Sequence, residues 1–203
     1  DGVRFNAVPN AAADALLSAA PVDAFGFLTS SPAPIQIQDT QLFLDGQTIS
    51  LVGGDIGIDG GGVNGGIAAP NGRIEIASVA SPGEVVRTSQ GLNVDAFAQL
   101  GTVSLTNNAV LDVSDFNGTG AGAIHIRGGR FLMDQSRIAA DTFGDADGSH
   151  VGIDIGVRND VVLQNFSVIS STTQGGLGRA SDIAITASSV LVDKLSVISS
   201  SSV

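Results

Sequence analysis

The sequence contains no cysteine, tryptophan or tyrosine, and it has only 6 prolines in 203 residues. The absence of cysteine excludes disulfides and thiolate metal ligands. Nine phenylalanines supply all of the Phe, Trp and Tyr class. Sugar-cleaving clefts commonly stack pyranose rings on aromatic faces, so this composition argues against a polysaccharide-cleaving enzyme.

Basic residues are also scarce. The chain has 9 Lys and Arg against 20 Asp and Glu, which gives a formal net charge of −11. The basic residues are scattered between Arg4 and Lys194, whereas phosphate binding needs them clustered. We therefore expect no nucleic-acid partner and no attraction to an anionic membrane surface. No apolar run approaches the roughly 20 residues that a spanning helix needs, so we expect no membrane insertion.

Glycine and the aliphatic residues are abundant, with 27 glycines and short runs in which apolar and polar residues alternate. Such runs occupy residues 35–37, 42–44, 49–51, 56–58, 74–76, 103–105 and 111–113. Alternation with period two is typical of strands. The Gly- and Asn-rich segments between the runs, such as 60–66 and 107–108, suit tight turns with positive φ. The pattern predicts an all-β protein.

Apolar anchors recur with a long period in the C-terminal half. They are Ile124, Ile153 and Ile183; Met133, Leu163 and Val192; and Ile138, Val168 and Val197, each of the last three lying five residues beyond the preceding anchor. A fixed long period is the signature of a stacked array. An antiparallel sandwich or barrel built from hairpins would show no such period.

The intervals between anchors also suggest the length of one coil. Ile74 and Val103 are 29 residues apart, but Val103 and Ile124 are only 21 apart. We interpret this as a bare coil of about 20 residues, to which loops at 141–149 and 172–179 are added. The sequence thus predicts a parallel β-helix, or solenoid, of roughly seven coils with loop insertions. It would span residues 35–203 and continue beyond them, after an extended leading segment at 1–34.

Several phrases resemble the large bacterial exoproteins of the filamentous-haemagglutinin type. The phrases are Ala24 to Leu28, Pro32 to Ile35, Gln47 to Ile56, Ala69 to Ile74, Ala77 to Val85, Ile126 to Arg130 and Ala139 to Thr142. The start, Asp1 to Phe5, is similar to the end of that family's N-terminal secretion domain. The resemblance implies a right-handed parallel β-helix and two-partner secretion, in which a β-barrel transporter exports the protein through the outer membrane. It also implies an adhesin or fibre on the bacterial cell surface. The chain has no Asn-Pro-Asn motif of the secretion domain, so we assign no transporter-recognition residues.

One loop is a candidate metal site. Asp141, Asp145 and Asp147 share a predicted loop, with Gly148 available for a sharp turn. Calcium favours several oxygen ligands from a flexible loop. The closing Glu of an EF-hand is missing, and an ordinary solvated acidic loop is the alternative. A calcium-stabilised extracellular fibre is therefore a second alternative function, and we expect no other cofactor.

A β-helical polysaccharide lyase or hydrolase is the main rival. His125 and Asp154 occupy matching positions on successive predicted coils, with Arg127 beside them, and such groups could serve acid–base catalysis. The alternative, which we favour, is a ladder of outward side chains between inward isoleucines, with His125 and His150 both at the surface. We also expect the Ser and Thr residues at 170–173, 188–189 and 199–202 to form polar ladders at turns.

The sequence therefore favours a structural or adhesive segment that is secreted or displayed on the cell surface, and that is not an enzyme. Its receptor, whether a host protein, a cell-surface group or a glycan, is not indicated by any motif. An array with uncapped ends presents unpaired strand edges, so end-to-end or lateral self-association is a further prediction.

Overall fold

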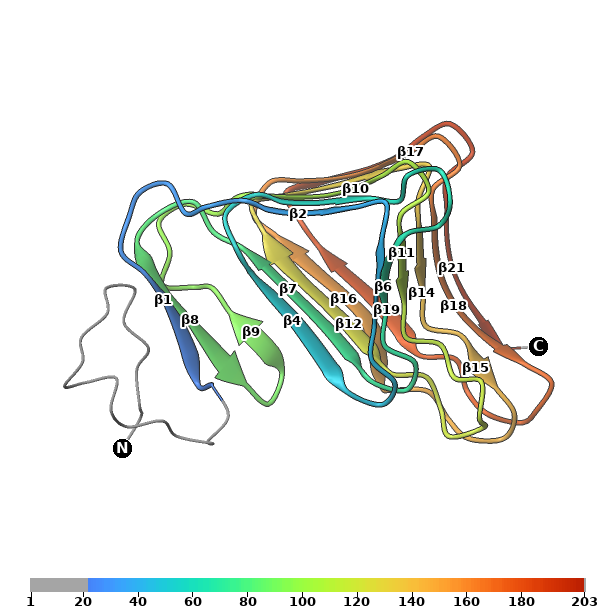
Figure 1. The fold of residues 1–203 in the computed structure, drawn as a ribbon. Helices are drawn as coiled ribbons and strands as arrows, with labels where there is room; N and C mark the ends of the chain where they lie inside the picture. The colour runs from blue at the N-terminus through green and yellow to red at the C-terminus, as the bar shows by residue number, and fades with distance from the viewer. Residues whose placement is uncertain (1–21, 203) are drawn as a thin grey trace.

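The computed structural model describes residues 22–202. Three parallel sheets form the three faces of a solenoid with a triangular cross-section (Figure 1). The described residues are all-β, with no helix, and therefore none that could cross a bilayer. The predicted parallel β-helix is confirmed. It has about six turns rather than seven, because each turn contributes one strand to a six-stranded sheet.

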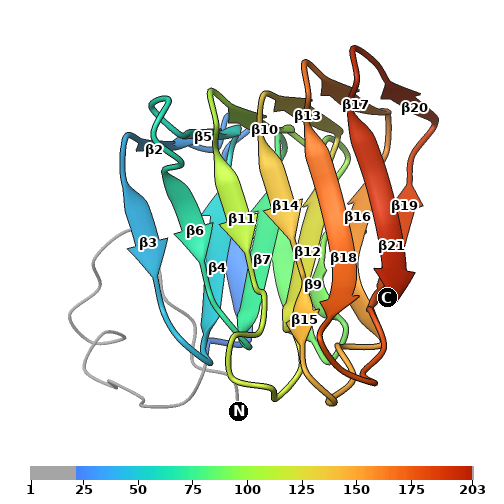
Figure 2. The same ribbon diagram turned by 90° about the vertical axis from the view of Figure 1, so that its right-hand side faces the viewer.

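We call the three faces sheets I, II and III, in the order in which each coil visits them. Sheet I contains β2 (Ile35–Gln38), β5 (Ile56–Asp59), β10 (Thr102–Thr106), β13 (Arg130–Asp134), β17 (Asp160–Gln164) and β20 (Ser189–Val192). Sheet II contains β3 (Gln41–Phe43), β6 (Gly66–Ala68), β11 (Val110–Asp112), β14 (Arg137–Ala139), β15 (Thr142–Phe143), β18 (Val168–Gln174) and β21 (Val197–Ser202). Sheet III contains β4 (Thr48–Gly53), β7 (Arg73–Ser78), β12 (Ala123–Gly128), β16 (Val151–Val157) and β19 (Asp182–Thr186). Figure 2 shows the coils stacked in chain order along the rod.

The core lies inside the triangle, where alternate residues of the strands of sheets I, II and III point inward and stack on apolar residues one coil away. Ile124 pairs in register with Ile153, which pairs with Ile183. Met133 pairs in the same way with Leu163 and then Val192. The period-two pattern thus aligns the aliphatic side chains into continuous rows, and most of these are buried completely.

The corner between sheets I and II turns through residues with left-handed backbone. We number the coils one to six by their sheet I strands, β2, β5, β10, β13, β17 and β20. Coils three, five and six each have two such residues at this corner, for example Asn165 and Phe166 in coil five. Coil four has only Gln135. The fourth corner is therefore one residue shorter. As a result, Ile138 pairs with Ile169, and the predicted match of Ile138 with Val168 is wrong by one residue. The match of Val168 with Val197 is confirmed.

A small antiparallel sheet interrupts the solenoid. It consists of β1 (Ala24–Phe27), β8 (Gly83–Thr88) and β9 (Gly91–Asn93), and it forms a second apolar cluster with the outward side chains of sheet III, including Ala77. Because β8 and β9 are inserted between coils two and three, Val103 pairs with Ile56 and not with Ile74. The predicted equivalence of Ile74 and Val103 is therefore wrong, and the interval from Val103 to Ile124 joins two different sheets.

The length of the bare coil is nevertheless close to the prediction. Ile35 pairs with Ile56, 21 residues further on. Later coils take 28 to 30 residues because the corner between sheets II and III grows into loops at 113–122, 140–150 and 175–181. The predicted loop at 141–149 lies there, except that Thr142 and Phe143 form the short strand β15, and residues 172–174 of the other predicted loop belong to β18. Of the predicted leading segment, residues 1–21 lie outside the described residues, and β1 pairs with β8.

Candidate functional site

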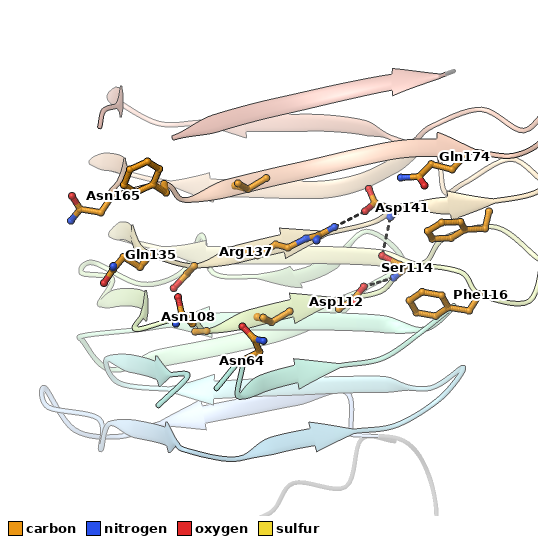
Figure 3. A pocket seen from close by; sticks show the side chains of 16 residues that line it. Asn64, Asn108, Asp112, Ser114, Phe116, Gln135, Arg137, Asp141, Asn165 and Gln174 are labelled. Atoms are coloured by element: carbon orange, nitrogen blue, oxygen red, sulfur yellow. Dashed lines mark hydrogen bonds and ion pairs between the residues drawn. The ribbon is translucent and has the colours of Figure 1, made fainter. Parts of the chain in front are cut away.

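The outer face of sheet II carries a shallow hollow of about 690 Å³. Its floor consists of the outward side chains of β11, β14 and β18, namely Val110, Asp112, Arg137 and Val168. One wall is the left-handed corner between sheets I and II, and the other wall is formed by residues at the start of the long loops. Figure 3 shows the hollow running across successive coils.

Arg137 is held at the floor by a buried carboxylate. Arg137 Nη2 donates to Asp141 Oδ2 at 2.8 Å, and the Asp141 side chain is only 6% exposed. The other oxygen, Oδ1, accepts hydrogen bonds from the backbone N–H and the hydroxyl of Thr172, at 2.9 and 3.0 Å. The Arg137 side chain itself is 54% exposed, so its remaining N–H groups face the hollow and solvent.

Two phenylalanine rings stack at the loop wall. The centroids of Phe116 and Phe143 are 5.6 Å apart, with an interplanar angle of 20°, and Phe116 is 64% exposed. The loop that carries Phe116 is fixed by the buried Asp115, which accepts hydrogen bonds from the backbone N–H groups of Asn117 and Gly120. Burial alone raises the pKa of Asp115, but these backbone bonds outweigh it, and the pKa lies below its ordinary value. The aromatic wall is therefore preorganised.

A row of side-chain amides forms the opposite wall. Asn64, Asn108, Gln135 and Asn165 come from four successive coils and all have positive φ. The row is staggered, because Gln135 and Asn165 follow the paired residues Met133 and Leu163 by two positions, whereas Asn108 follows Leu105 by three. Phe166, which is 66% exposed, follows Asn165 and also lines the hollow. Within residues 22–202, the amides of Asn64 and Gln135 make no side-chain hydrogen bond to the protein and face the hollow or solvent.

The three carboxylates of the calcium candidate do not converge. Asp141 is tied to Arg137 and Thr172 in the floor of the hollow. Asp145 and Asp147 are exposed, and each accepts a backbone N–H from the loop of the next coil, from Leu177 at 3.0 Å and from Arg179 at 2.8 Å. In the described part of the chain, no group of three His, Asp or Glu side chains is arranged to hold a metal ion.

The candidate catalytic pair lies on sheet III. His125 and Asp154 are neighbours in register, as the spacing predicts. Asp154, however, pairs with Arg127 at 2.6 Å, and Arg127 also donates to the backbone carbonyl of Asp154. His125 contacts a different partner, since its Nδ1 donates to the carbonyl of Gln90 at 2.8 Å. The outward ladder is thus observed, with each member held by a neighbour.

The prediction that both histidines lie at the surface is correct for His150, whose side chain is 93% exposed, but wrong for His125, which is buried. The turn between β8 and β9 covers it, and no sequence pattern reveals that this insertion folds back onto sheet III. Burial, and next the charge of Arg73, lower the pKa of His125. The adjacent Glu75 is also buried, and it accepts hydrogen bonds from Ser50 and Arg87.

The predicted serine and threonine ladder is present, but in strands rather than at turns. Residues 170–173 of β18 pair in register with residues 199–202 of β21. Some rungs face inward, such as the fully buried Ser171, whose hydroxyl donates to the carbonyl of Ala140. The hydroxyl of Ser171 thus satisfies a backbone group inside the rod, whereas that of Thr172 binds the Asp141 carboxylate.

Sequence reasoning missed the hollow on sheet II. Its residues share no local motif, and the phenylalanines Phe116, Phe143 and Phe166 lie on different coils. The Asn and Gln residues that follow β10, β13 and β17 are the one signal that could have indicated an exposed amide row.

Comparison of the chain with family models, with curated proteins and with solved structures finds no match.

Proposed function

We propose that this chain is a non-enzymatic, structural and adhesive segment of a secreted bacterial surface protein of the filamentous-haemagglutinin type. The β-solenoid supports this proposal because it is a stiff, elongated scaffold that presents long exposed faces and loops. Export by a β-barrel transporter and display at the cell surface follow from the sequence resemblance alone. End-to-end or lateral self-association stays a prediction.

The observation that carries the proposal is the exposed hollow on sheet II, with donors and aromatic rings on its walls. A ligand could rest there without being enclosed. The carboxylates beneath it already have structural partners, because Asp112 accepts the backbone N–H of Ser114 and Asp141 holds Arg137. An acid–base pair would instead need carboxyl groups that are free to reach a substrate.

The rival polysaccharide-cleaving function is supported by one feature, the adjacency of His125 and Asp154 on sheet III. The two functions separate in a paired assay. Beads coated with the chain through a C-terminal tag are tested for adhesion to epithelial cells, bacterial cells and glass. The soluble chain is incubated with neutral and uronate-containing polysaccharides, and new chain ends are measured.

We expect coated beads to adhere more than albumin-coated beads, and no chain ends to appear. Turnover that is present in the unaltered chain and lost in both His125→Ala and Asp154→Asn would overturn the non-enzymatic proposal. His150→Ala is the matched control, because its side chain is exposed and contacts Asp182 rather than His125, Arg127 or Asp154.

A further inference from the structure

The hollow on sheet II spans three successive coils along the rod and extends parallel to the strands from the amide row to the stacked rings, which constrains the shape of what it binds. Its floor crosses β11, β14 and β18, three successive coils, and its walls are the amide row and the stacked rings. A ligand that touches both walls must therefore extend across the sheet, parallel to the strands, and a chain of several linked units can cover that distance.

The chemistry of the walls constrains the ligand further. Amide groups both donate and accept hydrogen bonds, and Arg137 adds donors at the floor, while Phe116 and Phe166 offer exposed ring faces. Hydroxyl groups that alternate with apolar C–H faces are complementary to such a surface. A sugar ring has both features.

The charges in and around the hollow favour an uncharged ligand. Arg137 is the single basic side chain that lines it, and Asp141 already neutralises that charge at 2.8 Å. Asp112 also lines the floor, and the whole chain has a formal net charge of −11. An acidic polysaccharide would be repelled.

A peptide that adds a strand is excluded from this surface. Such binding requires an unpaired strand edge. Both edges of β11 are paired, with β6 and β14, and both edges of β14 are paired, with β11 and β18. The hollow offers side chains only.

We propose that the hollow on sheet II binds a neutral oligosaccharide, laid across the sheet from the amide row to the Phe116–Phe143 pair. Phe166 would contact a sugar face from the amide side, and Arg137 would donate to a hydroxyl from the floor. The inference rests on the proposed adhesive function and assigns a ligand class to it.

The test uses calorimetric titration with neutral hexasaccharides of β-1,4-linked glucose, mannose and N-acetylglucosamine. A galacturonate hexasaccharide and a heparin hexasaccharide are the charged comparisons. We expect at least one neutral hexasaccharide to bind and neither charged one to bind more tightly. Tighter binding of a charged hexasaccharide, or no binding of any neutral one, would overturn the proposal.

Phe166→Gly and Leu195→Gly form a matched pair of variants. Leu195 occupies the equivalent corner position one coil further on, also with positive φ and an exposed side chain, but it does not line the hollow. Both changes relax the same backbone strain, so a purely structural effect would be shared. We expect Phe166→Gly to weaken binding by about three- to tenfold, as the loss of one aromatic contact implies, and Leu195→Gly to leave it unchanged. Equal effects would contradict the proposal.

Phe116→Ala, with Phe43→Ala as its control, repeats the test at the other wall. Both rings are exposed on the sheet II side, and Phe43 lies outside the hollow.

Adhesion of coated beads separates the two proposals. Adhesion that survives both Phe166→Gly and Phe116→Ala would leave the adhesive function standing and overturn the glycan site. Hexasaccharide binding without adhesion would overturn the adhesive function and leave the site standing.

Discussion

At the residue scale, His125 and His150 differ in solvent exposure because different segments pack over them. His150 is exposed in a corner loop, whereas His125 is covered by the turn between β8 and β9 and donates to the carbonyl of Gln90. The alternation of His125 between Ile124 and Ile126 predicted its outward direction correctly. Its burial could not be predicted, because it depends on an insertion that precedes it by some thirty residues in the chain.

The buried histidine predicts a dependence of stability on pH. The folded pKa of His125 lies below its unfolded value of about 6.5, because burial disfavours the charged ring. Below pH 6.5 the unfolded chain therefore binds more protons than the folded chain, and the free energy of unfolding falls as the pH falls towards the folded pKa.

We expect His125→Asn to reduce this loss of stability between pH 7.5 and 5.5, since its amide can still donate to Gln90 but does not titrate. The free energy of unfolding is measured by denaturant titration at each pH. His150→Asn serves as the control and should keep the pH dependence of the unaltered chain. An identical pH dependence in all three proteins would contradict the burial of a neutral His125.

At the element scale, the corners determine the register of the whole rod. The strand runs of sheets I and III are evident in the sequence, and so is the match of Ile124 with Ile153. The error at Val168 arose because a corner can turn with either one or two left-handed residues. Both kinds of corner place the next strand on the same face. The apolar pattern alone therefore does not show how many residues separate a sheet I strand from the following sheet II strand.

The corner between sheets II and III depends on close backbone approach. A side chain at Gly122 would collide with the carbonyl oxygen of Gly72 in the preceding coil, and one at Gly72 would collide with Gln47. Glycine is needed at both positions because there is no room for a side chain. Neither residue has a positive φ. The hydrogen bond from Ala123 N to the Gly72 carbonyl, at 3.1 Å, lies at the same place.

We expect Gly122→Ala to destabilise the solenoid by about 1–3 kcal/mol, the usual cost of forcing extra atoms into a packed site. Gly26→Ala is the control, because a Cβ there meets no atom within 4 Å. Thermal unfolding followed by circular dichroism measures the difference. A melting temperature of Gly122→Ala equal to that of Gly26→Ala would contradict the close packing of coils at this corner.

At the scale of the whole molecule, the repeat explains the rod, and the unrepeated residues explain its surfaces. A period of 29 to 30 residues was sufficient to predict parallel stacking. It could not predict the hollow on sheet II, because Phe116, Phe143 and Phe166 come from three different coils and share no motif. Stacking brings Phe116 and Phe143, about thirty positions apart in the chain, into contact, and it places Phe166 at the opposite wall.

The adhesive role is tested most directly by the shear stress that detaches coated beads from a cell layer. Beads carrying the chain, the Leu195→Gly variant or albumin are exposed to increasing flow, and the stress that removes half of them is recorded. We predict that the chain and Leu195→Gly resist a similar stress, well above that for albumin. Detachment of chain-coated beads at the stress that removes albumin-coated beads would contradict an adhesive rod.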